Sequence, residues 1–184
     1  MMPKLRQWLA GTADTGAAAV KTRVLMVCTG NICRSPTAEG VLHSKLQRAG
    51  LQGVVGVASA GTQGYHTREP PDPRAVRAAA QRGYEIGHIR ARPFREQDFA
   101  EFDWLLAMDQ THLDWLLKRA PPEAVGRIGL LMPLARRHAN LLEVPDPYFG
   151  GPTGFEHVLD LVEDASDGVI ERLLAGRPLA GAMA

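Results

Sequence analysis

Residues 24–40, VLMVCTGNICRSPTAEG, carry the clearest signals of the fold of this chain. The first four of these residues are apolar and, together with Arg23, predict a buried strand over 23–27. Ser35 and Pro36 are typical of a helix start, because serine caps the first turn and proline fits the first helical position. Apolar side chains then recur at helical spacing until Gly50, which is expected to end the helix.

The rest of the chain repeats this alternation of strand and helix. Further strands are predicted over 54–60, 103–108 and 127–132, and further helices over 71–83, 111–120 and 155–175. Such alternation predicts one α/β domain, with a four-stranded parallel sheet flanked by helices on both faces in a Rossmann-like arrangement. The working site of such a sheet lies beyond the carboxyl ends of the strands, where the loop after residue 27 is expected.

Length and composition agree with a single globular domain. The chain has 184 residues, of which 45% are hydrophobic and 22% charged, so neither a disordered nor a fibrous protein is expected. A net charge of +1 does not indicate binding to nucleic acid or to a membrane surface. We expect an N-terminal extension over 1–22 that is mobile and carries no signal peptide, a domain over 23–176, and a tail over 177–184.

The two cysteines, Cys28 and Cys33, point to a reducing compartment, because a secreted scaffold stapled by disulfides would use more of them. We therefore expect a cytoplasmic protein. The histidines show no metal-ligand spacing with these cysteines, so neither a metal nor another cofactor is predicted.

The loop CTGNICR has the residues that an anion site needs. A tight turn between strand and helix directs successive N–H groups toward one centre, and the helix N-terminus adds positive potential. Gly30 lets the backbone approach closely, Asn31 tolerates a left-handed conformation, and Arg34 offers a fork of donors. A cysteine at this focus, Cys28, is expected to act as a thiolate nucleophile rather than as a buried structural thiol.

Residues 24–40 closely resemble the signature of the low-molecular-weight protein tyrosine phosphatases. Three further stretches are similar to that family: SAGT at 59–62, LLAMD at 105–109 and DPY at 146–148. The resemblance covers about residues 23–175. It implies hydrolysis of protein tyrosine phosphate through a cysteinyl-phosphate intermediate.

The resemblance also implies a role for each residue of the motifs. Cys28 would be the nucleophile, Arg34 the phosphate clamp, and Asp146 the general acid and then the base. Phosphate would be bound by Thr29, Gly30, Asn31, Ile32, Cys33, Arg34 and Ser35. Ser35 would hydrogen-bond the sulfur and Asn31 would pin the loop. Considered alone, Asp146 between two prolines would be a turn residue.

The same resemblance implies a slot for a phenyl ring. Tyr148 and Phe149 would wall it, although simple core packing would also explain two aromatics. Ile32 stands where a related branch that acts on phosphoarginine has threonine, and its apolar side chain favours a phenyl ring. Val55 stands where the family often has an aromatic residue, which puts one wall of the slot in question.

Three residues are given supporting roles. His88 resembles a family histidine that braces the phosphate loop, with a surface histidine as the alternative. Asp109 is expected either to support the site from the end of the third strand or to cap the following helix. Cys33 is expected to form a reversible disulfide with Cys28 under oxidant, or simply to pack beneath the loop.

Three other functions fit the sequence less well than phosphotyrosine hydrolysis. A thioredoxin-coupled arsenate reductase needs further cysteines, and a non-catalytic phosphotyrosine-binding module would have lost part of the catalytic trio. A protein-arginine phosphatase is disfavoured by Ile32. The expected partners are tyrosine-phosphorylated proteins, with a bacterial tyrosine kinase as one candidate, and inorganic phosphate or other oxyanions as inhibitors.

Overall fold

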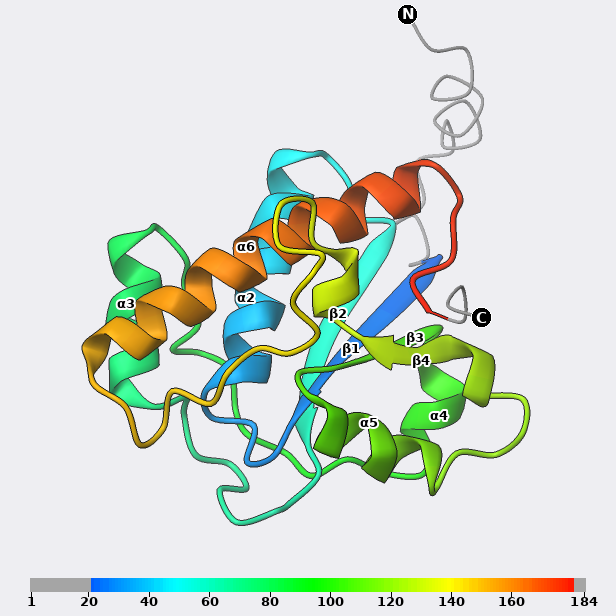
Figure 1. Cartoon of the computed structure of the whole chain (residues 1–184), viewed down its shortest axis with the longest axis horizontal. Helices are drawn as coiled ribbons and strands as arrows, with labels where there is room; N and C mark the ends of the chain where they lie inside the picture. The colour runs from blue at the N-terminus through cyan, green and yellow to red at the C-terminus, as the bar shows by residue number, and fades with distance from the viewer. Residues whose placement is uncertain (1–20, 181–184) are drawn as a thin grey trace, which may run out of the picture.

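The computed structural model describes residues 21–180 (Figure 1). Four strands form one parallel sheet in the order β2-β1-β3-β4. The strands are β1 (Thr22–Cys28), β2 (Val55–Gly61), β3 (Trp104–Ala107) and β4 (Ile128–Leu130). The predicted four-stranded parallel sheet is confirmed, and each strand falls within or close to its expected range.

Helices cover both faces of this sheet, as predicted. One face carries α2 (Arg34–Arg48), α3 (Pro73–Gln81) and α6 (Pro152–Leu174), and the other carries α4 (Asp98–Glu101) and α5 (Gln110–Leu117) (Figure 1). The 3-10 turns η1 (Val125–Arg127) and η2 (Met132–Leu134) flank β4. The single turn α4 was not predicted, because four residues carry too short a periodic signal.

The central strand β1 explains why the sequence contains a continuous apolar run. Val24 and Met26 face the core beneath α2 and α6, whereas Leu25 and Val27 face the core beneath α4 and α5. All four side chains are fully buried. A strand covered on both faces needs apolar residues at every position, since successive side chains point to opposite sides.

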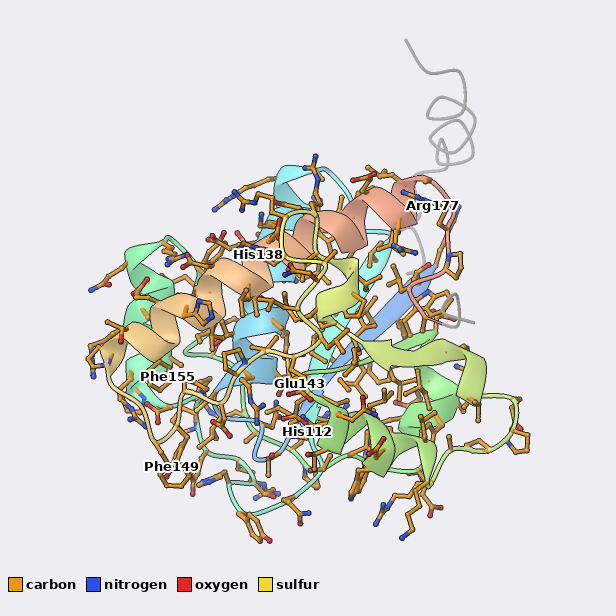
Figure 2. All side chains as sticks on the ribbon, viewed as in Figure 1. His112, His138, Glu143, Phe149, Phe155 and Arg177 are labelled. Carbon is orange, nitrogen blue, oxygen red and sulfur yellow. The ribbon has the colours of Figure 1, made fainter. Side chains whose placement is uncertain are left out.

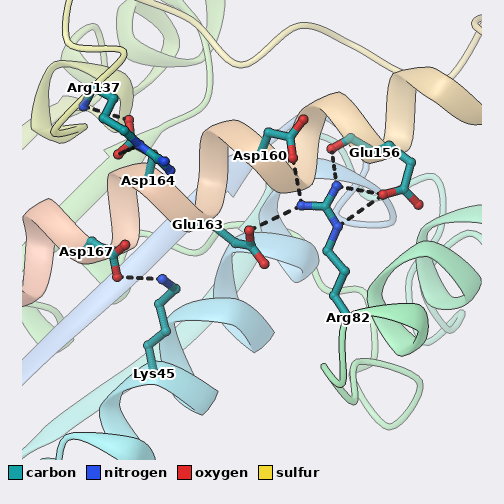
Figure 3. A network of polar contacts seen from close by, with 8 residues as sticks. All are labelled: Lys45, Arg82, Arg137, Glu156, Asp160, Glu163, Asp164 and Asp167. Carbon is teal, nitrogen blue, oxygen red and sulfur yellow. Dashed lines mark hydrogen bonds and ion pairs between the residues drawn. The ribbon is translucent and has the colours of Figure 1, made fainter.

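Ion pairs connect α2 and the end of α3 to α6 (Figure 3). Arg82, just after α3, donates to three carboxylates on α6: Glu156 at 2.7 Å, Asp160 at 2.8 Å and Glu163 at 3.2 Å. Lys45 of α2 pairs with Asp167, also on α6. A shared network of this kind is more stabilising than isolated surface pairs, so α6 holds α2 and α3 in fixed positions.

The predicted extension and tail fall only partly within the described residues. Residues 1–20 and 181–184 lie outside them, and Thr22 already pairs with Val55 in the sheet. Leu179 is buried in the core.

Between residues 21 and 180, no helix is long and apolar enough to cross a membrane.

Candidate active site

The loop between β1 and α2 forms a cup of backbone donors. Cys28 is the last residue of β1 and Arg34 is the first residue of α2, so the loop joins the carboxyl end of a central strand to a helix N-terminus. Asn31 adopts the left-handed conformation, with φ of 56°. Within residues 21–180, no N–H group of residues 29–33 donates a hydrogen bond to another protein group. This arrangement suits a bound oxyanion.

The end of β2 supports this loop through its backbone. The N–H of Thr62 donates to the carbonyl of Cys28 at 2.8 Å, and the N–H of Gln63 donates to that of Thr29 at 2.9 Å. A Cβ atom at Gly61 would lie only 2.6 Å from the Thr29 carbonyl oxygen. Position 61 of the SAGT stretch is therefore glycine, because no larger residue fits against the loop.

Ser35 contacts the cysteine instead of capping the helix. Cys33, not Ser35, occupies the cap position of α2, so the predicted cap is wrong. The Oγ atom of Ser35 lies 3.0 Å from Sγ of Cys28, in a fully buried position. A hydroxyl at this distance can donate to a thiolate, which stabilises the charged sulfur.

Asn31 ties the loop to its surroundings through its side chain. Its Nδ2 group donates to Oγ of Ser35 and to Oγ of Ser59, each at 2.8 Å. Its Oδ1 atom accepts from the N–H of Arg92 at 3.0 Å. Ser59 in turn donates to Glu39, whose pKa is raised chiefly by burial. Asn31 thus fixes the loop from behind rather than lining the cleft.

Arg34 is buried, and its guanidinium group donates hydrogen bonds to three acceptors. Its Nη1 group donates to Oδ2 of Asp109 at 2.6 Å and to the carbonyl of Val144 at 3.2 Å. Its Nη2 group donates to Oδ2 of Asp146 at 3.0 Å. Burial would raise the pKa of Asp109, but hydrogen bonds from His112 and Arg34 outweigh it and hold that pKa well below its usual range. Asp109 remains ionised and anchors the guanidinium group.

Asp109 fills both of the roles that its sequence position suggested. Its Oδ1 atom accepts from the N–H of His112, which caps α5, while its Oδ2 atom holds Arg34.

A cleft with a volume of about 300 Å³ opens over the loop. Its lining comprises Cys28, Thr29, Gly30, Ile32, Cys33, Arg34, Tyr65, His66, Asp146, Tyr148 and Phe149. The rings of Tyr148 and Phe149 meet edge to face with centroids 5.0 Å apart, and Phe149 is 95% exposed at the margin of the molecule (Figure 2). Apolar rings around a cup of donors suit a flat aromatic group that carries an oxyanion.

Val55 does not lie where its sequence position suggested. Val55 pairs with Thr22 at the opposite end of β2, so it is not a wall of the cleft. An aromatic residue that was not predicted, Tyr65, lines the cleft and is 77% exposed. Tyr65 and His66 follow SAGT by only a few residues, and that proximity was the signal for them.

The predicted brace His88 is exposed, and within the described part of the chain it makes no hydrogen bond to the loop. A different histidine, His112, is within hydrogen-bonding distance of the loop, with its Nε2 atom 2.8 Å from Oγ1 of Thr29. His112 comes three residues after Asp109, where a strand end and a helix start meet, and that position could have indicated it.

Between residues 21 and 180, no three side chains of His, Cys, Asp or Glu gather in a way that could hold a metal ion.

Fold and cleft together define the class of protein: an α/β domain with a cysteine at the centre of an anion-binding loop after its first strand. The family model for low molecular weight phosphotyrosine protein phosphatases matches residues 23–177. The chain is 44% identical over 150 residues to a low molecular weight protein-tyrosine-phosphatase of Streptomyces coelicolor, covering 80% of this chain and 91% of that one. It is 41% identical over 152 residues to a putative one of Synechocystis, covering 82% and 96%.

A crystal structure of a protein tyrosine phosphatase from Entamoeba histolytica, with Hepes in its active site, superposes with a TM-score of 0.82. That protein is 37% identical, and the match covers 84% of this chain and 98% of that one. The chain belongs to the low molecular weight phosphotyrosine protein phosphatase family, a family of hydrolases.

Proposed function

We propose that this protein hydrolyses the phosphate ester of phosphotyrosine in other proteins, with Cys28, Arg34 and Asp146 as its catalytic residues. One observation carries the proposal: these three side chains line one cleft above a loop whose N–H groups point to no other protein acceptor within residues 21–180. A thiol, a guanidinium group and a carboxyl group around an oxyanion cup are the parts that a two-step phosphoryl transfer needs.

In the first step, the Cys28 thiolate attacks phosphorus in line with the tyrosine oxygen. The sulfur–phosphorus bond forms as the phosphorus–oxygen bond to tyrosine breaks, and Asp146 gives its proton to the leaving oxygen. Arg34 and the loop amides hold the three equatorial oxygens. Asp146 is suited to this role because its side chain is about half exposed, at the mouth of the cleft.

In the second step, water attacks the cysteinyl-phosphate. Asp146, now a carboxylate, takes a proton from the water, and the electron pair of the sulfur–phosphorus bond returns to Cys28 as a thiolate. The hydroxyl of Ser35, 3.0 Å from the sulfur, stabilises that negative charge. Phosphate leaves, and the free enzyme is restored.

The cleft favours an aryl phosphate over a phosphoarginine. Ile32 lines it together with the rings of Tyr65, Tyr148 and Phe149, so the group next to the phosphate meets apolar surface. A charged guanidinium would lose hydration there without gaining a hydrogen-bonding partner from Ile32. We further propose a cytoplasmic location, a tyrosine kinase among the substrates, and inhibition by phosphate and other oxyanions. The two free cysteines support the cytoplasmic location.

The test is hydrolysis of p-nitrophenyl phosphate and of a phosphotyrosine peptide in the presence of EDTA. We expect turnover by the wild-type protein and none by Cys28→Ser, because a serine hydroxyl is a far weaker nucleophile than a thiolate. Cys33→Ser is the matched control, since it alters the other cysteine and should retain activity. Full activity in Cys28→Ser would refute the proposal, as would faster hydrolysis of a phosphoarginine peptide than of the phosphotyrosine peptide.

A further inference from the structure

We propose that His112 is a positioning residue that takes up a proton when phosphate binds and thereby turns the Thr29 hydroxyl into a donor to the phosphoryl group. The inference rests on the proposed function and assigns a role to two residues outside the catalytic trio. It predicts a phosphate-binding donor that exists only while His112 is charged.

The geometry places His112 between the loop and the anchor of Arg34. His112 lies on the first turn of α5, is only 2% exposed, and is labelled in Figure 2. Its Nε2 atom lies 2.8 Å from Oγ1 of Thr29, which lines the cleft beside Cys28. Its Nδ1 atom lies 2.8 Å from Oδ1 of Asp109, at an angle too oblique for a hydrogen bond.

The short contact with Asp109 decides which neutral form of the ring is allowed. Asp109 is ionised, so a bare lone pair on Nδ1 of His112 at 2.8 Å would be repelled by it. The neutral ring therefore carries its proton on Nδ1, and Nε2 is an acceptor. The Thr29 hydroxyl has one hydrogen, and in this state it must donate that hydrogen to Nε2.

Protonation of the ring reverses this hydrogen bond. With a proton on each nitrogen, Nε2 of His112 donates to Oγ1 of Thr29, and the hydroxyl hydrogen is free to turn into the cleft. The Nδ1 atom, which is buried without a hydrogen-bond partner, becomes part of an ion pair with Asp109. Charge on the ring thus strengthens its attraction to Asp109 and supplies a new donor beside Cys28.

The charged groups that connect His112 to the cup are expected to favour a protonated ring when phosphate binds. Asp109 faces the ring directly, and Arg34 and Asp146 extend the chain of contacts from it. Glu143 lies close by and accepts from the N–H of Gln110 at the start of α5. A phosphate dianion in the cup adds negative charge and draws Arg34 toward it, which leaves more of the Asp109 charge to stabilise a protonated His112. The proton comes from solvent.

The direct test is ¹⁵N NMR of the histidine rings at neutral pH, with and without inorganic phosphate. We expect the His112 signals to change from those of a ring protonated on Nδ1 alone to those of a ring protonated on both nitrogens. The exposed His43 is the internal control and should not change. Unchanged His112 signals at a phosphate concentration that inhibits p-nitrophenyl phosphate hydrolysis would overturn the proposal.

Variants then test the role of the hydroxyl through the pH dependence of phosphate inhibition between about pH 5 and pH 8. Thr29→Val keeps the shape of the side chain but removes the donor, and His112→Asn offers an amide that does not titrate. Both should remove one protonation step from the profile, and Thr29→Val should weaken phosphate binding about tenfold at the acid end. Thr29→Ser should keep the wild-type profile, as should His43→Asn.

A wild-type profile in Thr29→Val would overturn the inference even where hydrolysis itself is normal. A wild-type protein that binds phosphate but does not hydrolyse aryl phosphates would instead contradict the proposed function, so the two failures are distinguishable.

Discussion

Arg34 and Asp146 lie 112 residues apart in the sequence, yet Nη2 of the first donates to Oδ2 of the second at 3.0 Å. This bond joins the proposed phosphate clamp to the proposed acid. A phosphate dianion in the cup competes for the same guanidinium donors, because charge-assisted bonds to phosphate are strong and forked. We therefore expect substrate binding to free the Asp146 carboxyl group beside the leaving oxygen.

Replacement of Asp146 by alanine should lower kcat for phenyl phosphate by about 10² to 10⁴-fold, the usual contribution of a general acid. The loss should be smaller for p-nitrophenyl phosphate, whose leaving group needs less protonation. A series of aryl phosphates measures this: log kcat should depend more steeply on leaving-group pKa in Asp146→Ala than in wild type. Asp114→Asn, at an exposed carboxylate on α5, is the control. Equal slopes would remove Asp146 from the acid role.

Asp109→Asn should reduce kcat/KM for p-nitrophenyl phosphate by about 100-fold, because Arg34 loses the charge that orients it. The loss should appear in both kcat and KM, since Arg34 contacts the phosphoryl group in the ground state and in the transition state. Steady-state kinetics separate the two terms. A urea titration checks that the variant is folded, and unchanged kinetics in a folded variant would contradict the anchoring role.

Cys33 should make oxidative inactivation reversible. Burial, together with the nearby carboxylate of Asp72, raises the pKa of Cys33 to about 12, so it remains a thiol at neutral pH. Peroxide oxidises Cys28 to a sulfenic acid, which can condense with the Cys33 thiol to give a disulfide and water. After brief peroxide treatment, dithiothreitol should restore more activity to wild type than to Cys33→Ser. Equal recovery in both proteins would contradict a Cys28–Cys33 disulfide.

Asp164 should stabilise the fold above about pH 4 and lose that effect in acid. Burial would raise its pKa, but hydrogen bonds from His138 and Arg137 lower it to about 2. A carboxyl group whose folded pKa lies below its unfolded value of about 3.9 stabilises the native state above that value and ceases to do so as pH falls through about 2.

Asp164→Asn should therefore cost about 2 kcal/mol of unfolding free energy at neutral pH. The difference from wild type should shrink as the pH falls from about 4 to about 2. Urea unfolding at several pH values measures it, with Asp114→Asn as the exposed control. A difference that stays constant down to pH 2 would show that shape, not charge, sets the effect.

Local signals in the sequence were enough for the sheet and for the centre of the site. Residues 24–50 contain a strand, a loop and a helix whose propensities agree, so their order and approximate bounds follow from pattern alone. Ser35 is an exception, because its local preference for a helix cap is outweighed by the contact with Cys28 that the loop creates.

Contacts between distant segments could not be predicted in this way. His112 reaches Thr29 across 83 residues, and nothing local to either residue fixes that distance. Tyr65 lies on a loop whose path depends on how β2 ends against Thr29, so its place in the cleft follows from the close approach at Gly61. These segments lie together because of the strand order, and that order cannot be read from a single sequence.

The carbonyl of Val144, which accepts from Arg34, belongs to a fully buried residue whose N–H donates to Met108 at 2.7 Å, just beyond β3. Asp146 follows only two positions later, so its backbone is held in place by this hydrogen bond beside the sheet. We therefore expect the proposed proton donor to stand at the site before substrate arrives. With this residue already in place, we expect that catalysis requires no flap to shut over the ester.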